Sequence, residues 1–338
     1  MVCGMSSSNA FKPPVIDGVG PSTVGIPAKT ALSAIDFLTA KFSAVSRDKW
    51  LNRFAAGEIM NAIGRVMKPQ DSLLLESHLY YYRNIHNEPE LPSKARVIFQ
   101  DDYLVVADKP HFMPVTPGGR YVQQSLLVQL KQALNLPELS PIHRIDRETA
   151  GLLVFSVRAQ DRNAYQELFR QRLVEKTYEA IAGATDASTQ GMVFPLVYRS
   201  MMVEDTQFFK MRELARDATS HETAFNSETW IDCVSSFSSA SSNPLSIHHS
   251  RQYPKSLARY ILKPLTGQRH QLRVHMNALG LPLINDQLYP HVLRGADEAD
   301  DFNAPLQLLA KTIVFKDPIS GVSREFESQL KLYGMDRS

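Results

Sequence analysis

The stretch HRIDRETAGLLVF, which runs from His143 to Phe155, joins a charged loop to a core strand. Its second half begins at Gly151 and is an unbroken apolar run, which is typical of a buried strand. Its first half places one carboxylate, Asp146, among basic side chains. A carboxylate beside guanidinium groups is held in its ionised form, which suits a nucleophile or an ion-paired base and argues against a general acid.

Asp146 also has a plain structural interpretation, as part of an ion pair or as a helix cap. Its neighbours favour a site instead. Arg144 and Asp146 are two residues apart, so in an extended chain they project from the same face. The loop therefore presents both charges in one direction, and we treat it as a candidate functional site.

The composition limits the class of protein. The chain has 338 residues, 43% of them hydrophobic, so it can bury a full core and form one large domain with a smaller one. A net charge of +2 neither requires nor excludes a nucleic-acid partner. The two cysteines, Cys3 and Cys233, can form no disulfide framework or zinc knuckle, and no run of ~18 apolar residues occurs. We expect a cytoplasmic protein without a membrane segment.

Residues 1–28 are rich in Ser, Gly and Pro, and they predict a flexible arm. Two helical patterns and the strand-like stretch 78–85 follow and predict a small N-terminal module. From about residue 90, strands and a few helices are interleaved, which indicates an α+β domain. The Ser-rich stretch 234–250 predicts a mobile insertion. Expected strands lie in 93–110, 176–183, 256–267 and 306–327, and expected helices in 123–134, 161–173 and 266–280.

The stretch TGQRHQLRVHM is expected to begin a helix with Thr266 as its N-cap and Gly280 just after its end. Arg269 and Arg273 would then lie one turn apart on one face. This is either a surface helix with solvated charges or a helix that delivers Arg273 to a carboxylate such as Asp146. His270 and the histidine five residues on lack the HExxH glutamate, so we expect no zinc site.

Two further stretches carry candidate residues. Tyr178, on the strand EKTYEAIAG, is either a core residue or a ring that stacks on a flat substrate. Lys109 follows a predicted strand and precedes a glycine-containing loop that could contact phosphates. The chain lacks the glycine-rich nucleotide loops and the GxSxG nucleophile elbow, which leaves an enzyme that needs no metal or organic cofactor.

In this order, the motifs resemble the RluA family of pseudouridine synthases over roughly residues 95 to 330. DDYLVVADKP is similar to the family's opening strand, HRIDRETAGLLVF to its HRLDxxTSGLL signature, and EKTYEAIAG to its K-x-Y strand. LTGQRHQLRVHMNALGLPLINDQLY is similar to TGRxHQLRxHxxxxGHPIxGDxxY. The resemblance implies the pseudouridine synthase fold, with a mixed, mostly antiparallel central sheet flanked by helices and loops.

The resemblance also implies an activity: isomerisation of uridine in ribosomal or transfer RNA to pseudouridine, without a cofactor. Asp146 matches the catalytic aspartate, Tyr178 the tyrosine that stacks on uracil, and Arg273 the arginine paired to the carboxylate. Arg144 matches the arginine that takes the place of the flipped-out base. The other residues expected to contact substrate or RNA are His143, Arg147, Lys109, Arg269, His270, Gln271 and Leu272.

The chain departs from the family patterns at several positions. Ala150 replaces a serine, Gln268 replaces the TGR arginine, and Leu281 replaces the GHP histidine. Asn285 replaces the glycine of the GD pair, although Asp286 remains. Near the end, Leu309 replaces a histidine. We expect these changes to affect RNA contacts and local packing more than the chemistry.

We expect three parts: the arm at 1–28, an S4-like RNA-binding α/β module at 29–90, and a catalytic domain at 91–338. The protein is expected to be a monomer that binds RNA. Two other functions are open at this point. One is an inactive RNA-binding protein that keeps the synthase fold, which retention of Asp146, Tyr178 and Arg273 opposes. The other is a small-molecule hydrolase, which only Asp146 supports.

Overall fold

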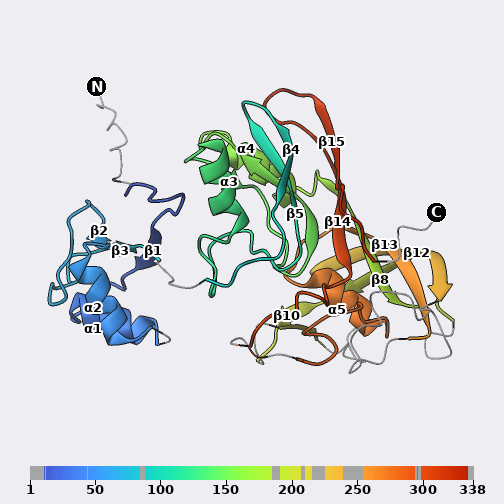
Figure 1. Ribbon diagram of the computed structural model, residues 1–338, viewed down its shortest axis with the longest axis horizontal. Helices are drawn as coiled ribbons and strands as arrows, with labels where there is room; N and C mark the ends of the chain where they lie inside the picture. The colour runs from blue at the N-terminus through green and yellow to red at the C-terminus, as the bar shows by residue number, and fades with distance from the viewer. Residues whose placement is uncertain are drawn as a thin grey trace. The chain divides into compact units, whose positions relative to one another are not determined.

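The computed structural model describes residues 11, 13–43, 45–83, 88–184, 191–206, 210–214, 225–238, 254–293, 295 and 298–333. The chain divides into two compact units (Figure 1). The first contains Met1–Pro89 and Thr116–Pro137, and the second contains Glu90–Val115 and Glu138–Ser338. The segment 116–137, which the sequence placed in the catalytic domain, therefore groups with the N-terminal residues.

The first unit contains the expected helix, helix and strand, and it adds two further strands and a third helix. Its elements are β1 (Ser22–Gly25), α1 (Ala34–Lys41), α2 (Arg47–Ala55), β2 (Ile59–Asn61), β3 (His78–Tyr81) and α3 (Leu126–Leu134). Helices α1 and α2 begin where Ser33 and Ser46 accept hydrogen bonds from backbone N–H groups three residues on. The strands form an antiparallel sheet in the order β1-β3-β2.

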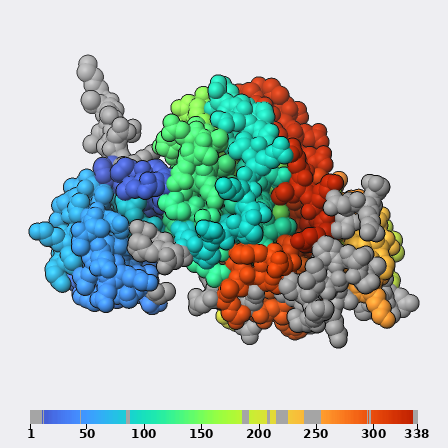
Figure 2. All heavy atoms as spheres, viewed as in Figure 1, coloured from blue at the N-terminus to red at the C-terminus, as the bar shows by residue number. Residues whose placement is uncertain are grey.

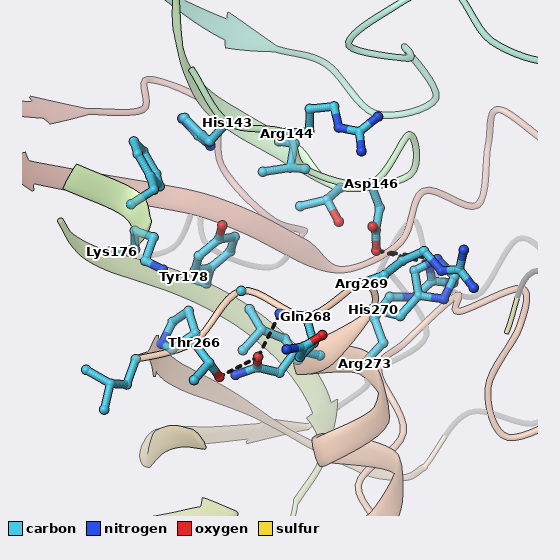
Figure 3. Close-up of a pocket in the computed structure, with 18 of the residues that line it drawn as sticks. His143, Arg144, Asp146, Lys176, Tyr178, Thr266, Gln268, Arg269, His270 and Arg273 are labelled. Carbon is cyan, nitrogen blue, oxygen red and sulfur yellow. Dashed lines mark hydrogen bonds and ion pairs between the residues drawn. The ribbon is translucent and has the colours of Figure 1, made fainter. Parts of the chain in front are cut away.

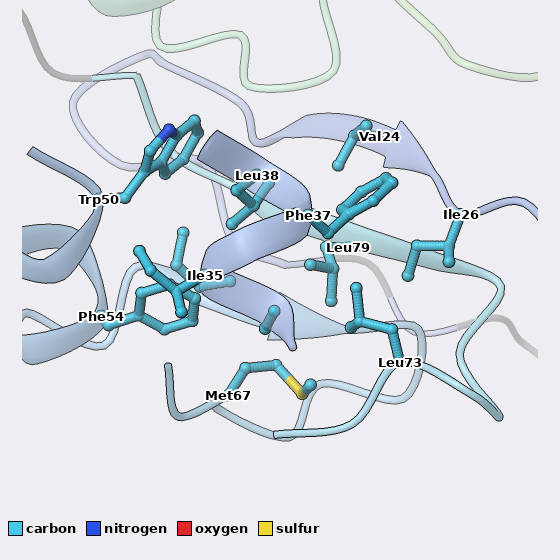
Figure 4. Packing of buried hydrophobic residues seen from close by; sticks show 12 residues of the cluster. Val24, Ile26, Ile35, Phe37, Leu38, Trp50, Phe54, Met67, Leu73 and Leu79 are labelled. Carbon is cyan, nitrogen blue, oxygen red and sulfur yellow. The ribbon is translucent and has the colours of Figure 1, made fainter. Parts of the chain in front are cut away.

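A compact apolar core holds the first unit together. Ile35, Leu38 and Trp50 from the two helices and Leu79 from β3 are fully buried in it (Figure 4). Each such side chain contributes about 1.5–3 kcal/mol by leaving water. Strand β1 pairs with β3 within this unit, so residues 22–25 are ordered and the prediction of a flexible arm is wrong for them.

The second unit is built on a ten-stranded sheet with the path β4-β5-β7-β14-β8-β13-β12-β9, to which β15 and β6 add at β14 and β7. All pairings are antiparallel except β7 with β14, so the sheet is mixed and mostly antiparallel, as expected for an α+β fold. The strands are β4 (Arg96–Gln100), β5 (Leu104–Lys109), β6 (Ser140–Pro141), β7 (Ala150–Ser156), β8 (Glu175–Gly183), β9 (Leu196–Ser200), β12 (Ser227–Ser238), β13 (Ser256–Pro264), β14 (Leu308–Lys316) and β15 (Ser323–Glu327). Strands β10 (Met202–Glu204) and β11 (Met211–Glu213) form a separate hairpin.

Strand β7 is the apolar run of the opening stretch, and all seven of its residues are buried. It crosses β14 so closely that position 151 has no room for a side chain. Gly151 has φ +109°, and a Cβ there would lie 2.3 Å from the carbonyl oxygen of Ala310. The glycine is therefore required by both backbone conformation and contact.

Two helices cover the sheet of the second unit. Helix α4 (Arg162–Arg170) packs Tyr165 against Leu152 and Val154 of β7. Helix α5 (Gln271–Ala278) packs Leu272 and Met276 against the small residues of β8. The predicted helix at 161–173 is confirmed over Arg162–Arg170. Asp161 is its N-cap residue, but its carboxylate binds Arg158 and makes no capping hydrogen bond.

Helix α5 begins four residues later than the sequence predicted. Its N-cap residue is His270, in the left-handed region at φ 56°, and not Thr266. The Thr266 hydroxyl instead accepts from the N–H of Glu228 and donates to Gln271. Arg269 thus lies outside the helix, and the predicted pairing of Arg269 with Arg273 on one helix face is wrong. Gly280 does follow the helix end, at φ +72°.

The last strands return to the first ones of the second unit. In Figure 2 the surface of β4 and β5 lies directly beside that of β14 and β15. Phe99 packs on Phe326 with ring centroids 5.1 Å apart, and Arg324 binds Asp101. Of the Ser-rich stretch predicted to be mobile, residues 234–238 end strand β12, and residues 239–250 lie outside the described residues.

Candidate active site

A pocket of about 940 Å³ opens in the second unit and collects residues from several elements (Figure 3). The loop before β7 contributes Asp146 and Arg144, strand β8 contributes Tyr178, and helix α5 contributes Arg273. Asp146 is the one acidic side chain among the residues that line the pocket. The three residues predicted to be catalytic are thus brought together from distant parts of the sequence.

Two side chains, Lys109 and His111, hold the loop that carries Asp146 by hydrogen bonds to its backbone carbonyls. The Lys109 ammonium donates to the carbonyl oxygen of Arg147 at 2.9 Å, and His111 Nδ1 donates to that of Glu148 at 2.7 Å. Within the loop, the N–H of Thr149 donates to the Asp146 carbonyl. These bonds satisfy buried carbonyls and hold the carboxylate of Asp146 in one place.

Lys109 is fully buried, with 0% of its surface exposed. Burial lowers its pKa to about 7, although the charges of Glu148 and Asp146 oppose this shift. Lys109 therefore cannot offer a contact to an RNA phosphate, and this expectation is wrong. The side chain supports the Asp146 loop instead.

Arg273 lies between two carboxylates. Its Nε and Nη2 donate to both oxygens of Asp286 at 2.8 and 2.6 Å, while Nη1 reaches Asp146 Oδ2 at 3.3 Å. Burial alone would lower the pKa of Arg273, but Asp286, Asp146 and Glu148 raise it above its ordinary value. The cation is thus permanent, and its tightest partner is Asp286, to which the sequence assigned no role. Asp146 receives the remaining, longer contact.

Tyr178 lines the pocket from β8, as Asp146 does from the loop before β7 (Figure 3). Burial raises the pKa of its hydroxyl, and the negative charge of Asp146 adds to the shift. The phenol therefore stays protonated at neutral pH. It can donate a hydrogen bond or present its ring, but it is not a ready base.

His270 stands near the catalytic carboxylate, with Nε2 3.9 Å from Asp146 Oδ2. Its Nδ1 lies 3.0 Å from the hydroxyl of Tyr289, which itself donates to the carbonyl of Met211. Burial lowers the pKa of His270, while Asp146 raises it and Arg273 lowers it further. His270 is therefore neutral at pH 7, with Nδ1 carrying the proton toward Tyr289.

The other expected contacts in the opening stretch differ from one another. Arg144 lines the pocket, is exposed, and has no hydrogen bond or ion pair with any residue the structure describes. His143 also lines it, but its ring stacks on Phe169 and its Nε2 accepts from the N–H of Val154. Burial, with the charge of Lys176, lowers the pKa of His143 to about 3, so it is neutral.

Arg147 does not line the pocket. Its guanidinium binds both oxygens of Asp300 at 2.8 Å and also pairs with Glu148. These carboxylates hold the guanidinium outside the pocket lining, and the expected contact of Arg147 with RNA stays a prediction. The sequence could not reveal this partner, which lies 153 residues away.

The predicted contacts of the TGQRHQLR stretch are also divided. Gln271 lines the pocket, but its buried amide is occupied by Thr266, Thr229 and backbone groups of Glu228 and Gln268. Leu272 belongs mainly to the core under the pocket. Arg269 remains at the rim with 40% of its side chain exposed, 3.4 Å from Glu204.

Sequence reasoning missed Lys176, which lines the pocket two residues before Tyr178 on β8. Strand alternation would have placed both side chains on one face. It also missed Arg172, which follows the end of α4 at the pocket. Within the described ranges, no three His, Cys, Asp or Glu side chains gather as metal ligands would. Every helix described is too short or too polar to span a lipid bilayer.

Comparisons with known proteins agree with this geometry. The family model described as RNA pseudouridylate synthase matches residues 103–278, which include Asp146, Tyr178 and Arg273. A dual-specificity RNA pseudouridine synthase RluA of Escherichia coli is 27% identical over 72% of this chain and 96% of its own. An uncharacterized RNA pseudouridine synthase of Synechocystis is 25% identical over 75% of this chain and 78% of its own.

A solved structure shares the fold. Human RNA Pseudouridylate Synthase Domain Containing 1 superposes with a TM-score of 0.52 at 18% sequence identity, covering 72% of this chain and 86% of that one. The fold and the matched sequence family therefore agree. The chain belongs to the RNA pseudouridylate synthase family, among its RluA-type members, and is an isomerase that acts on uridines in RNA.

Proposed function

We propose that this protein converts specific uridines in structured ribosomal or transfer RNA to pseudouridine with Asp146 as the nucleophile and without a cofactor. The observation that carries the proposal is the setting of Asp146. It is the one acidic side chain lining a pocket rich in cations, and it is 3.3 Å from a buried arginine. A polyanionic substrate is attracted by such a pocket, while the single carboxylate stays available for its reaction.

The reaction is an internal exchange. The bond from C1′ to N1 of the uracil breaks, a bond from C1′ to C5 forms, C5 loses a proton, and N1 gains one. No oxidant or second substrate is needed. An ionised carboxylate can attack either the sugar or the base, or remove a proton on the glycal route, and Asp146 suits each of these.

The other pocket residues take roles that follow from their protonation states. Arg273 orients the Asp146 carboxylate through its fixed position on α5. Tyr178 stacks on the uracil and orients it, because its protonated hydroxyl is a poor base. Arg144, exposed and without a partner among the described residues, fills the gap that the flipped nucleotide leaves in the RNA.

An inactive RNA-binding protein is the other function to consider. Such a protein has no need for a buried arginine shared between Asp146 and Asp286. Loss of one member alone costs about 3–5 kcal/mol of folding stability, but replacement of the whole set by apolar residues is often neutral. Retention of the whole arrangement supports catalysis.

The test is to map pseudouridines in total RNA from cells that carry the wild-type gene, the Asp146→Asn variant or no gene. We expect one or a few sites that appear only with the wild-type protein. If the three maps were identical, the proposed activity would be absent. The positions of the sites would also identify the RNA.

We further propose that residues 29–90 act as an S4-like RNA-binding module and that the catalytic protein works as a monomer. The module has its own core, which supports an independent binding role. The cytoplasmic location predicted from the cysteines stays a prediction. RNA binding by the full chain and by a variant with the exposed Arg47 and Lys49 changed to Ser would test the module.

A further inference from the structure

The cations that line the pocket fall into two groups. Arg273, Arg269 and Arg170 are each paired, with Asp286, Glu204 and Glu167 respectively. The side chains of Arg144, Arg172 and Lys176 have no hydrogen bond or ion pair with any described residue. The second group comes from separate segments, the loop before β7, the end of α4 and strand β8.

Lys176 is the most unusual member of the second group. Its side chain is only partly exposed and lies beside Tyr178 in the pocket (Figure 3). Burial lowers its pKa to about 8, and no carboxylate opposes the shift. A desolvated ammonium without an anion is unfavourable, so it is stabilised when a bound ligand supplies the negative charge.

Arg172 extends this positive region to the rim. It lies two residues after the end of α4, in the left-handed conformation at φ 59°, and its side chain is exposed. Its neighbour Arg170 serves as a contrast, because Arg170 is bound to Glu167 and Asn163 on the same helix. The chain therefore leaves Arg172 open while it neutralises Arg170.

We propose that Lys176 and Arg172 form a phosphate subsite, in which Lys176 binds the phosphate on the 5′ side of the target uridine and Arg172 binds the next one along the strand. The proposal rests on the proposed function, because it uses uracil stacking on Tyr178 as its reference point. Side chains two residues apart on a strand are about 7 Å apart. A single nucleotide spans that separation from its base to its phosphate. Tyr178 can therefore hold the base while Lys176 holds the phosphate of the same nucleotide.

The first test measures RNA binding and does not depend on turnover. The probe is an unmodified transfer RNA transcript, titrated at several salt concentrations with wild type, Lys176→Met, Arg172→Met and Lys316→Met. Lys316 is exposed on β14 and outside the pocket, so it controls for loss of one surface charge. The slope of log affinity against log salt is negative. We expect Lys176→Met and Arg172→Met each to reduce its magnitude by about 1, and Lys316→Met to leave it unchanged.

The second test locates the contact. A synthetic RNA carries the mapped uridine with a neutral methylphosphonate in place of the phosphate on its 5′ side. With wild type, we expect KM to rise about tenfold or more, since a hydrogen bond between charged groups is lost. With Lys176→Met, KM is already raised on normal RNA, and the methylphosphonate adds no further loss. Lys176→Arg keeps the charge and should restore most of the affinity.

Each outcome decides something different. Additive effects of Lys176→Met and the methylphosphonate would show that the lysine contacts another group and would overturn the proposal. Unchanged salt slopes in both variants would overturn it as well. If the wild type made no pseudouridine but the slopes changed, the proposed activity would fail while the phosphate subsite would stand.

Discussion

The two sides of the pocket handle charge in opposite ways. Around Asp146 and Arg273, the described charges are paired: Arg273 binds Asp286 at 2.6 and 2.8 Å and reaches Asp146 at 3.3 Å. Around Arg144, Arg172 and Lys176, positive charges stand without a partner among the described residues. The first side is organised before substrate arrives, as the placement of a reacting group requires. The second side is complementary to an anion that the protein does not itself contain.

The largest effect is expected from the reacting group. Asp146→Asn should reduce pseudouridine formation on the order of a thousandfold or more, because the amide is neither a nucleophile nor a base. RNA affinity should stay within about twofold of wild type, and the free energy of unfolding within ~1 kcal/mol of it, since the pocket keeps its shape and loses no cation. Radiolabel release from RNA and urea denaturation measure the two quantities. Turnover at the wild-type rate would remove Asp146 from the mechanism.

Arg273→Met should reduce both stability and activity, because it removes the cation that Asp286 and Asp146 share. It leaves Asp286, whose side chain is 1% exposed, as a buried charge without its guanidinium. We expect a loss of about 3–5 kcal/mol in the free energy of unfolding, together with most of the activity. Arg269→Met, at the exposed rim, is the matched control and should cost less than about 1 kcal/mol.

A double variant separates the two roles of Arg273. Changing Arg273→Met together with Asp286→Leu removes the uncompensated charge and should recover much of the stability but not the activity. Recovery of both would mean that Arg273 only supports the fold. If Arg273→Met alone lost neither stability nor activity, the result would contradict the contacts of Arg273 with Asp286 and Asp146.

The pH dependence should reveal His270. Its pKa lies below the ordinary value of 6.5, so it is neutral at pH 7 and becomes charged as the pH falls through its lowered pKa. The cation then lies 3.9 Å from Asp146 Oδ2 and competes for the carboxylate. We expect kcat of the wild type to fall on the acid side, and the acid limb to move to lower pH in His270→Gln. An unchanged profile in the variant would exclude this explanation.

The smallest effect is expected at Arg147. Asp300→Asn weakens the ion pair between Arg147 and Asp300, and it should cost about 1 kcal/mol or less because the pair is partly exposed. The rate should change by less than about tenfold, since Lys109 and His111 still fix the loop. Glu175→Gln, on the exposed start of β8, controls for loss of one negative charge. A rate loss as large as that of Arg273→Met would show that the pair positions Asp146.

Local patterns predicted most of the fold. The apolar run after Asp146, the alternation around Tyr178 and the periodic helices each produce their element through nearby residues alone. Helix α5 was predicted to start too early, because Thr266 has the chemistry of an N-cap but uses its hydroxyl elsewhere.

The candidate site was predictable only in part. Asp146, Tyr178 and Arg273 were found because they lie in motifs that resemble a known family. Lys109 was expected to contact a phosphate because it precedes a glycine-containing loop, and Arg147 was expected to contact RNA because it lies in a stretch that resembles the family signature. Whether such a residue is exposed depends on partners far away in the sequence, such as Asp300, and no local pattern contains that information.

Strand β14 has a consequence for when activity can arise during synthesis. It lies between β7, which follows the Asp146 loop, and β8, which carries Tyr178, although it is made after both. The two halves of the site therefore have no shared sheet until residues 308–316 have left the ribosome. A nascent chain that lacks them can hold each half but cannot assemble the pocket, so unfinished chains should be unable to modify the RNA that surrounds them.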